Sequence, residues 1–282
     1  MPEHKLGIQR IKSLKLEDQD LYARMKEVGF DATFTLWGGR DAMREQAKFI
    51  RSAGLIYHSQ HMLWQHSPEL WEDDGKAGED ALAEHLSCLH ATAEAGVPVM
   101  VTHVIMGMTR NHPTALGVKR FETLIREAEK EGVVIAFENT EGEAYLETVM
   151  KAFQGSPALG FCFDTGHEMC YNHSKDMLTP YGGILTETHL NDNLGISDPA
   201  GMIDWHDDLH LLPFDGIADW EGIARRIKRA RPVDVLMMEI NTVSKPGRNE
   251  NERYAAMTPE DFLRLAYERV LRLRDMVENA AL

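Results

Sequence analysis

The stretch VVIAFENTEGEAYLETVMKAFQGSPALGFCFD, residues 133–164, decides the fold. It begins with an apolar run that ends in Glu138, continues with an amphipathic segment over 143–153, and closes with a second apolar run, 159–164, that ends in Asp164. A strand, a crossover helix and another strand in this order are typical of a parallel sheet. The stretch therefore predicts two parallel strands, each with an acidic residue at its carboxyl end.

The same alternation runs along the whole chain. Strands are predicted at residues 6–9, 32–37, 55–58, 99–103, 133–138, 159–164, 184–189 and 235–240. Helices are predicted at 17–28, 40–53, 78–95, 113–131, 143–153, 220–230 and 259–279, with a further helix over 169–178. Strand–helix units of this number in 282 residues favour closure into an α/β fold of the TIM type, a single (β/α)8 barrel domain over residues 1–282. Two loops are longer than their neighbours, 58–76 and 191–219.

Composition and charge restrict the class of protein. Hydrophobic residues make up 43% of the chain and charged residues 27%, as in a globular protein with a sizeable core. Apolar runs are shorter than the ~20 residues of a membrane helix, and the N-terminus lacks the apolar segment of a secretory signal. We therefore expect no membrane and a cytoplasmic location. The net charge of −15 counts against a nucleic-acid partner, which binds a basic face.

Cysteine usage agrees with a cytoplasmic location. The three cysteines are odd in number and lack CxxC spacing, so they suit a reducing compartment better than a disulfide framework. Cys162 alternates with Phe161 and Phe163 in a predicted strand, and we expect it in the core.

Ionisable residues stand at the carboxyl ends of four successive predicted strands. Glu138 ends the fifth strand, Asp164 the sixth and His189 the seventh, and Glu239 lies near the end of the eighth. In an α/β barrel these strand ends build the active site. Converging buried carboxylates repel one another unless a cation neutralises them. Each residue alone could equally be a helix cap or a structural histidine, but together they predict a divalent-metal site. Mixed oxygen and nitrogen ligands suit Mn²⁺ first, with Mg²⁺, Co²⁺ or Zn²⁺ as alternatives.

Other histidines fall near the same end of the predicted barrel. His103 ends the fourth strand, His167 follows Asp164 by about one helical turn, and Asp208 and His210 lie in the loop after the seventh strand. They are expected as substrate-binding residues or as partners of the metal ligands. The loop after the third strand adds His58, His61 and His66. Surface positions are expected for His61, His112, His173 and His206, and structural roles for His85 and His90.

Several short segments together resemble the xylose isomerase-like TIM-barrel superfamily, the sugar phosphate isomerase/epimerase group that includes the endonuclease IV-type (AP endonuclease family 2) enzymes. They are Phe137-Glu-Asn-Thr, Phe163-Asp-Thr-Gly-His, His189-Leu-Asn-Asp-Asn, Met238-Glu-Ile and the segment from Asp208 to Trp220, which is similar to DxHLxPGxGxIDW. The resemblance covers the whole predicted barrel, and the combination in this order is specific.

The resemblance implies roles for particular residues. Glu138, Asp164, His189 and Glu239 match the family's four metal ligands, and Glu138 and Glu239 also match the acid/base pair of its epimerases. His167 matches a substrate contact, and His210 matches a position that contacts substrate in some members and a metal in others. The implied function is a divalent-metal-dependent sugar isomerase or epimerase, which abstracts a proton next to a carbonyl through a metal-stabilised enediolate.

Two departures from the family pattern bear on the substrate. One glycine of the PGxG segment is missing, because the chain reads Pro213-Phe-Asp-Gly216. Position 195, which is a substrate-binding arginine in some ketohexose epimerases, is glycine. Both departures count against a ketohexose or a sugar phosphate. A dehydratase acting on an inosose or dehydroshikimate-like compound is the close alternative, since it also begins with proton abstraction next to a carbonyl.

A second class, phosphodiester hydrolysis of the endonuclease IV kind, would need further metal ligands. The chain offers a set similar to a trinuclear zinc site, with His66 and Asp208 as additional ligands: His66, His103, Glu138, Asp164, His167, His189, Asp208, His210 and Glu239. A non-catalytic sugar-binding barrel ranks last, because both glutamates of the acid/base pair are present.

The remaining expectations concern the substrate and assembly. Trp37, Trp64, Trp71 and Trp205 either stack on a sugar or polyol substrate or pack beneath long loops. Lys245 and Arg248, after the eighth strand, either bind an anionic group or are solvated. A homo-oligomer is compatible with the family resemblance.

Overall fold

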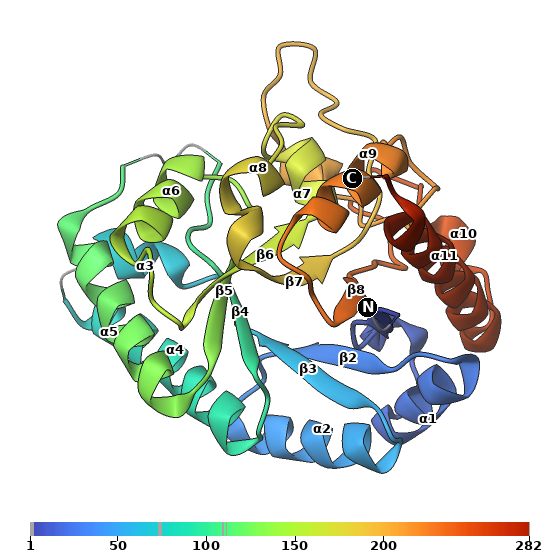
Figure 1. Ribbon diagram of the computed structural model, residues 1–282, viewed down its shortest axis with the longest axis horizontal. Helices are drawn as coiled ribbons and strands as arrows, with labels where there is room; N and C mark the ends of the chain where they lie inside the picture. The colour runs from blue at the N-terminus through green and yellow to red at the C-terminus, as the bar shows by residue number, and fades with distance from the viewer. Residues whose placement is uncertain (1–2, 73–74, 109, 111, 282) are drawn as a thin grey trace.

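A computed structural model describes residues 3–72, 75–108, 110 and 112–281. Within them, eight parallel strands follow the order β7-β6-β5-β4-β3-β2-β1-β8. Leu190 closes the ring, because it pairs with Met238 and its backbone N–H donates to the Met237 carbonyl at 2.8 Å. The strands are β1 (Lys5–Ile8), β2 (Ala32–Leu36), β3 (Ile56–His61), β4 (Val99–His103), β5 (Val134–Glu138), β6 (Leu159–Asp164), β7 (Leu185–His189) and β8 (Val235–Met238). The chain is a (β/α)8 TIM barrel, as the strand–helix alternation predicted, with helices around the strands (Figure 1).

Most predicted helices are present with small shifts of their ends. The α-helices are α1 (Asp18–Val28), α2 (Arg40–Ser52), α3 (Ser67–Glu72), α4 (Lys76–Glu94), α5 (Ala115–Glu131), α6 (Glu143–Ala152), α7 (Thr165–Cys170), α8 (Leu178–Tyr181), α9 (Trp220–Arg229), α10 (Glu252–Ala255) and α11 (Pro259–Asn279). The short 3-10 helices are η1 (Lys12–Leu14), η2 (Gly182–Ile184) and η3 (Trp205–Asp207). The helix predicted over 169–178 is wrong, since α7 and α8 lie on either side of a turn. The loop after β7 projects beyond the helices (Figure 1).

The third strand is longer than predicted. The pairing of β2 with β3 shifts by one residue between Thr33 and Phe34, whose partners are Tyr57 and Ser59, so His58 is an extra, bulged residue. A bulge bends a strand and changes which face the later side chains point to. Beyond it β3 continues to His61, so the predicted long loop, 58–76, begins with strand residues and also contains helix α3. Residues 73–74 of that loop lie outside the described residues.

The barrel interior changes from apolar to ionisable toward the carboxyl ends of the strands. Residues two apart on a strand face the same side, so Ala136 lies below Glu138, Cys162 below Asp164, and Met237 below Glu239. Ala136, Cys162 and Met237 are all fully buried, and Cys162 is a free thiol in the core, as expected. A much larger apolar cluster fills the space between strands and helices. Ala136, Cys162 and Met237 form an apolar floor beneath the ionisable strand ends, and the buried Glu187, which pairs with Cys162 in the register of β6 and β7, lies at the same level.

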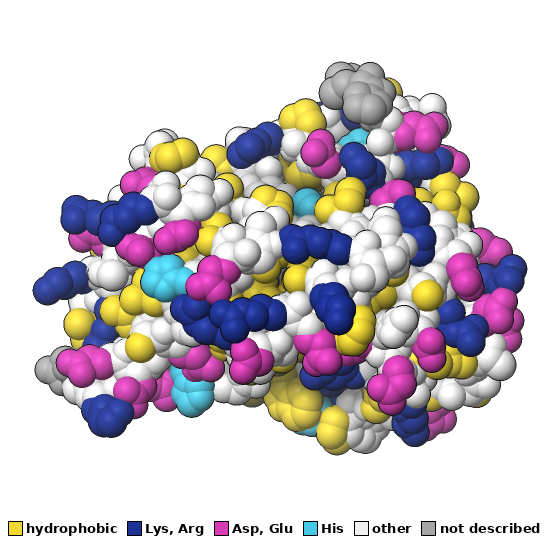
Figure 2. All heavy atoms as spheres, turned by 90° about the horizontal axis from the view of Figure 1, so that it is seen from below, with side chains coloured by type: hydrophobic (Ala, Val, Ile, Leu, Met, Phe, Trp, Pro, Cys, Tyr) yellow, Lys and Arg dark blue, Asp and Glu magenta, His cyan; other side chains and the backbone are white. Residues whose placement is uncertain are grey.

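The outer surface mixes charges of both signs. On the face in Figure 2, basic and acidic side chains alternate over the described residues instead of forming a continuous basic surface. In the part of the chain that the structure describes, no helix has both the length and the apolarity to cross a bilayer.

Candidate metal centre

The four residues at the strand ends meet at one point. Glu138, Asp164 and His189 are the last residues of β5, β6 and β7, and Glu239 directly follows β8. One donor atom from each lies within 4.8 Å of the donor atoms of the other three. His189 Nδ1 is 2.8 Å from Glu138 Oε1 and 3.2 Å from Glu239 Oε2. Ligand atoms ~2.1 Å from one ion are at most about 4.2 Å apart. The two distances from His189 Nδ1 meet this limit, and the bound on the whole group is slightly above it.

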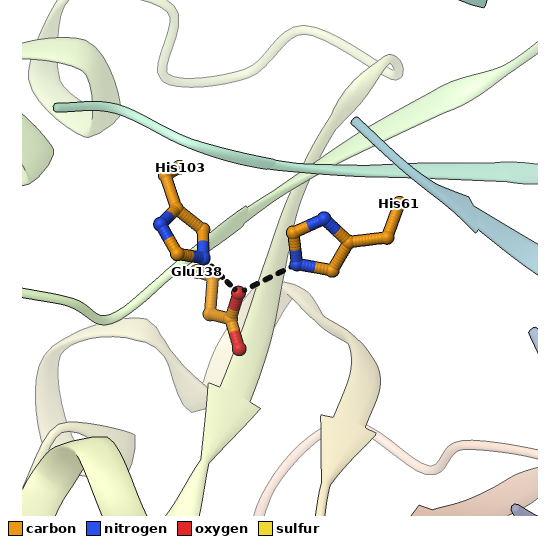
Figure 3. A group of neighbouring side chains, drawn as sticks. All are labelled: His61, His103 and Glu138. Carbon is orange, nitrogen blue, oxygen red and sulfur yellow. Dashed lines mark hydrogen bonds and ion pairs between the residues drawn. The ribbon is translucent and has the colours of Figure 1, made fainter. Parts of the chain in front are cut away.

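Glu138 lies at the centre of a wider group of histidine side chains. His61 Nε2 and His103 Nε2 lie 3.1 Å and 2.9 Å from its Oε2 (Figure 3). His189 Nδ1 lies 2.8 Å from its Oε1. The surface position expected for His61 is wrong, because the bulged β3 carries it into the barrel and leaves it 1% exposed. His61 Nδ1 lies 2.6 Å from the Met62 carbonyl, so that nitrogen is the donor and Nε2 faces the carboxylate.

The predicted additional ligand His66 lies elsewhere. Its side chain is exposed just before α3, whereas His61 occupies the position that the sequence assigned to it. Both histidines lie after residue 58, where the third strand was predicted to end. They differ because β3 continues to His61 and stops before His66. The prediction failed because an extra residue in a β-bulge has no sequence signature of its own.

A second group of ionisable residues lies beside the first. His210 Nε2 is 2.9 Å and His167 Nε2 is 3.6 Å from Asp208 Oδ1. On its other side, His167 Nδ1 is buried without a hydrogen-bond partner among the described residues, 3.6 Å from Glu138 Oε1 and 3.9 Å from Asp164 Oδ1. Asp164, His167 and His210 also have donor atoms within 4.8 Å of one another. An unpartnered buried nitrogen facing two carboxylates is suited to a cation held between them.

The backbone at His210 is unusual. Its φ of 49° lies in the left-handed region, which costs energy for a residue with a Cβ. The conformation holds the ring between Asp208 and the Glu239 carbonyl, 3.1 Å from Nδ1. Phe214, where the family pattern has glycine, is also left-handed with a φ of 73°, so the turn keeps its shape despite the substitution.

Asparagines position the candidate ligand Asp164. Its Oδ1 accepts from the His167 backbone N–H at 2.7 Å, and its Oδ2 accepts from Asn191 Nδ2 at 2.9 Å. Asp164 is therefore also the helix cap that its Asp-Thr-Gly context suggested. Asn139 exchanges hydrogen bonds with the Asp164 backbone, both at 2.8 Å. The sequence motifs contained Asn139 and Asn191, but the motifs did not indicate that these two residues would hydrogen-bond Asp164. A Cβ at Gly166 would meet Asn191 Oδ1 at 1.9 Å, which requires glycine there.

Protons on the histidines neutralise the carboxylates of this cluster. Burial by itself raises the pKa of Glu138, but His189, His103 and His61 outweigh it and hold that pKa well below its usual value. Burial also raises the pKa of Glu239, yet His189 and His210 lower it to about 2. Conversely, burial lowers the pKa of His210, but Asp208 and Glu239 raise it to about 9.

Asp164 has the opposite balance. Its burial outweighs the attraction of His167 and His210 and raises its pKa to about 6. Asp208 resembles Glu239, since His210 and His167 overcome its burial and hold its pKa well below the usual value. The cluster thus carries several negative charges that depend on nearby positive charge, the situation in which a bound cation is stabilising.

A cavity of about 520 Å³ opens onto the cluster. His61, His103, His167, Asp208, His210 and Glu239 line it, together with Trp64, Met106, Gly107, Met108, Glu141, Tyr171, Trp205 and Lys245. Met106, Met108, Glu141 and Tyr171 were not singled out from the sequence. A hollow of about 570 Å³ on the outer face of α11 is larger, but its lining has none of the clustered histidines.

The other sequence expectations can be placed around this cavity. Trp71 is buried and donates to the Val104 carbonyl at 2.6 Å, and Trp37 is 7% exposed in the core, so both pack and do not line the cavity. Lys245 Nζ lies 3.5 Å from Asp208 Oδ2 at the cavity, whereas Arg248 pairs with Asp207 and Glu250.

The remaining histidines lie apart from the cavity. His58 lies in the bulge of β3, with its Nε2 3.2 Å from Glu187 Oε2. His85 and His90 have the structural roles expected of them, against the Ala81 carbonyl and Glu127 respectively. His112 and His173 are exposed and His206 is half-buried beside Asp204, close to expectation.

The fold and this carboxylate–histidine centre define a (β/α)8 barrel with its site at the carboxyl ends of the strands. The chain belongs to the xylose isomerase-like TIM barrel family, whose model matches residues 22–263. It is also 30% identical over 141 residues to "Uncharacterized protein y4fM" of Sinorhizobium fredii (strain NBRC 101917 / NGR234). That match covers 49% of this chain and 39% of the relative, so it spans well under two thirds of the relative's length.

Solved structures with the same fold include enzymes acting on sugars. The IolI protein with a bound zinc atom is 18% identical, with a TM-score of 0.71 over 98% of this chain and 99% of that one. D-psicose 3-epimerase with D-tagatose, from Clostridium cellulolyticum H10, is 13% identical, with a TM-score of 0.70 over 97% and 99% of the two chains. At these identities the likeness establishes the fold.

Proposed function

We propose that this protein is a divalent-metal-dependent isomerase or epimerase of a sugar or polyol. The observation that carries the proposal is the convergence of Glu138, Asp164, His189 and Glu239 within 4.8 Å, beside a cavity of about 520 Å³. Three carboxylates and one imidazole suit Mn²⁺, with Mg²⁺, Co²⁺ or Zn²⁺ as alternatives. When bound there, the cation would polarise a substrate carbonyl and stabilise the charge left after removal of the neighbouring proton. The family and the sugar epimerases of the same fold support this choice.

Glu239 is placed to move the proton. It lines the cavity, and its side chain is 14% exposed, whereas that of Glu138 is fully buried. Its low pKa, about 2, keeps it ionised at neutral pH, the state that a base requires. Glu138 has both oxygens held by histidines, so its first role is to hold the cation, and it is the second member of the acid/base pair. His103, His167 and His210 line the cavity and bind substrate hydroxyl or carbonyl oxygens.

The test is proton exchange between substrate and solvent. We expect the metal-loaded protein to incorporate deuterium from heavy water at the carbon next to the carbonyl of one member of a panel of ketoses, inososes and keto-acids, followed by proton NMR. The same spectra distinguish the related dehydratase, whose product has lost water. Turnover without deuterium incorporation would contradict both mechanisms.

Glu239→Gln tests the residue assignment. The change keeps the shape of the side chain but removes the base, so we expect deuterium incorporation to fall by at least about 10³-fold, ~4 kcal/mol. Far-ultraviolet circular dichroism and the urea midpoint should change little, since Glu239 stands at the cavity. Retained exchange in a folded variant would mean that Glu239 is not the base.

One observation favours a second candidate function, metal-assisted hydrolysis of a phosphodiester. His61 and His103 form a group with Glu138, and His167, Asp208 and His210 extend the site on the other side. With His61 in place of His66, the nine residues of the trinuclear type of site converge. Imidazole-rich groups of this kind suit Zn²⁺. Against this candidate, Lys245 is the one lysine or arginine among the described residues that line the cavity, and the net charge is −15.

Metal content and one assay separate the two candidates. About one tightly bound ion per chain, measured by elemental analysis after dialysis, is expected for the isomerase, and about three for the hydrolase. Nicking of abasic DNA by the metal-loaded protein would overturn the isomerase proposal. The cytoplasmic location, the homo-oligomer and the absence of a nucleic-acid partner stay predictions from the sequence.

A further inference from the structure

The cavity above the cluster has two unlike walls. The ionisable wall consists of His61, His103, His167, Asp208, His210 and Glu239, which the proposed reaction uses. The apolar and aromatic residues of the lining, which we call the apolar wall, are Trp64, Met106, Met108, Tyr171 and Trp205. Isomerisation of a small sugar uses only the ionisable wall, so the apolar wall must serve another part of the ligand.

Trp64 joins the two walls. Its ring stacks on His103, with centroids 5.3 Å apart and planes 17° apart, and meets the edge of His61 at 5.9 Å. These contacts fix the plane of the indole next to the histidines that hold Glu138. A fixed aromatic face binds the C–H face of a sugar ring or another aromatic ring through its apolar surface. Trp64 therefore presents an apolar surface directly beside the reacting end of the ligand.

Trp205 lies at the mouth of the cavity. It begins η3, whose first turn is capped by Asp204, and its side chain is 44% exposed although large apolar residues usually bury more. Its ring centroid lies 4.0 Å from that of His206, with the planes tilted by 35°, and Lys245 Nζ lies 5.2 Å from the Trp205 centroid. An exposed indole held between two neighbours at a cavity mouth is a ready contact for an apolar group.

The charges around the cavity do not suit a phosphate. Lys245 is the single lysine or arginine among the described lining residues, and its ammonium faces the Asp208 carboxylate 3.5 Å away. Phosphate groups are normally bound by an arginine fork or by several positive groups. Glu141 adds a further carboxylate to the lining, with Oε1 accepting from the Gly107 N–H at 2.7 Å. The lining beyond the ionisable wall therefore does not favour a phosphate or another anionic group on the ligand.

The size of the cavity leads to the same conclusion. Its volume of about 520 Å³ falls in the range of sites for drug-sized ligands, which exceed a single six-carbon sugar. A monosaccharide bound at Glu239 would leave part of the cavity, along the apolar wall, to water. Apolar surface kept from water contributes roughly 25 cal/mol per Å², so a ligand that covers both indoles binds more tightly than one that does not.

We propose that the substrate is an uncharged keto-sugar joined to an apolar ring, an aryl glycoside in chemical terms, with its carbonyl at the ionisable wall and its aryl group against the apolar wall. The carbonyl end of this assignment rests on the proposed function. The aryl end rests on the apolar wall alone and can be tested without turnover.

The test compares the binding of three probes to the Mn²⁺-loaded protein by calorimetry: methyl β-glucoside, phenyl β-glucoside and glucose 6-phosphate. We expect phenyl β-glucoside to bind about tenfold more tightly than methyl β-glucoside, ~1.4 kcal/mol. Glucose 6-phosphate should bind no more tightly than methyl β-glucoside. Equal binding of the two glucosides, failure of both to bind, or tighter binding of the phosphate would overturn the proposal.

Variants locate the aryl group. Trp205→Ala should reduce the ratio of phenyl to methyl affinity to about one, and Trp205→Phe should keep most of it, because an aromatic face remains. Met202→Ala is the matched control, since Met202 is 69% exposed on the same loop and does not line the cavity, and the ratio should not change. An unchanged ratio in Trp205→Ala, or a loss of it in Met202→Ala, would contradict the assignment.

The results also separate this inference from the proposed function. If phenyl β-glucoside binds more tightly than methyl β-glucoside but no keto-sugar exchanges deuterium, the isomerase proposal is contradicted and the aryl subsite is supported. If simple ketoses exchange deuterium but the two glucosides bind equally, the isomerase proposal is supported and the aryl subsite is contradicted.

Discussion

His85 and His210 are both buried, yet their pKa values move in opposite directions. His85 lies on α4, 0% exposed, with Nδ1 2.8 Å from the Ala81 carbonyl and Nε2 without a partner among the described residues. Burial lowers its pKa to about 4. His210 is buried at the barrel mouth, but Asp208 at 2.9 Å and Glu239 raise its pKa to about 9.

The difference shows that the carboxyl ends of the strands favour positive charge. On α4 the protein excludes positive charge from an apolar site, whereas at the strand ends the carboxylates attract it. Without a metal, protons on the histidines supply that charge. A histidine ligand must be deprotonated, so binding of the proposed metal at the mouth would release protons, and its affinity would rise with pH.

The largest expected effect comes from neutralising Glu138, which lies at the centre of the cluster. Glu138→Gln keeps the shape of the side chain but removes the charge that three histidines and the proposed cation share. We expect turnover to fall by at least about 10³-fold, ~4 kcal/mol, and bound metal to be lost on dialysis. Steady-state kinetics and elemental analysis measure the two effects. Glu84→Gln, the same charge change beside His85, should alter neither, and full metal retention in Glu138→Gln would contradict the assignment.

A carboxylate placed one layer lower tests whether the cluster is special. Met237 is fully buried two residues before Glu239, in the apolar floor. Met237→Asp buries a carboxylate without a histidine, and we expect a loss of about 3–5 kcal/mol in the free energy of unfolding, measured in urea. Met237→Leu should lose less than about 1.5 kcal/mol. Similar stability of the two variants would mean that the layer around Met237 accommodates a carboxylate as well as the strand ends do.

The smallest expected effect concerns His85 and pH. Its folded pKa, about 4, lies below the unfolded value of 6.5, so its contribution to stability is present above pH 6.5 and is lost as pH falls through 4. Over that interval the loss approaches about 3 kcal/mol. His85→Leu should remove this part of the acid destabilisation in urea unfolding at pH 7, 5 and 4. His90→Leu, on the same helix but partly exposed beside Glu127, should keep it. Equal acid slopes for wild type and His85→Leu would contradict the pKa assigned to His85.

Much of the fold followed from local patterns. The apolar runs placed all eight strands, and the amphipathic stretches placed the long helices, because periodicity of side chains reports which face is buried. The region after β6 was misjudged, since α7 and α8 are short and their packing against neighbours outweighs their weak periodicity. Bound metal and catalysis at Glu138, Asp164, His189 and Glu239 stay proposals, although the structure brings the four together.

The sequence by itself determined the barrel and the strand-end positions of the four candidate ligands, because alternation and strand length are local properties. Only the tertiary structure decided that His61, and not His66, joins Glu138, since that choice depends on a one-residue shift in the pairing of β2 and β3. Tertiary structure also decided which tryptophans face the cavity. The opposite pKa shifts of His85 and His210 arise in the same way, because a pKa depends on groups that lie far apart in the chain and meet only when the barrel closes.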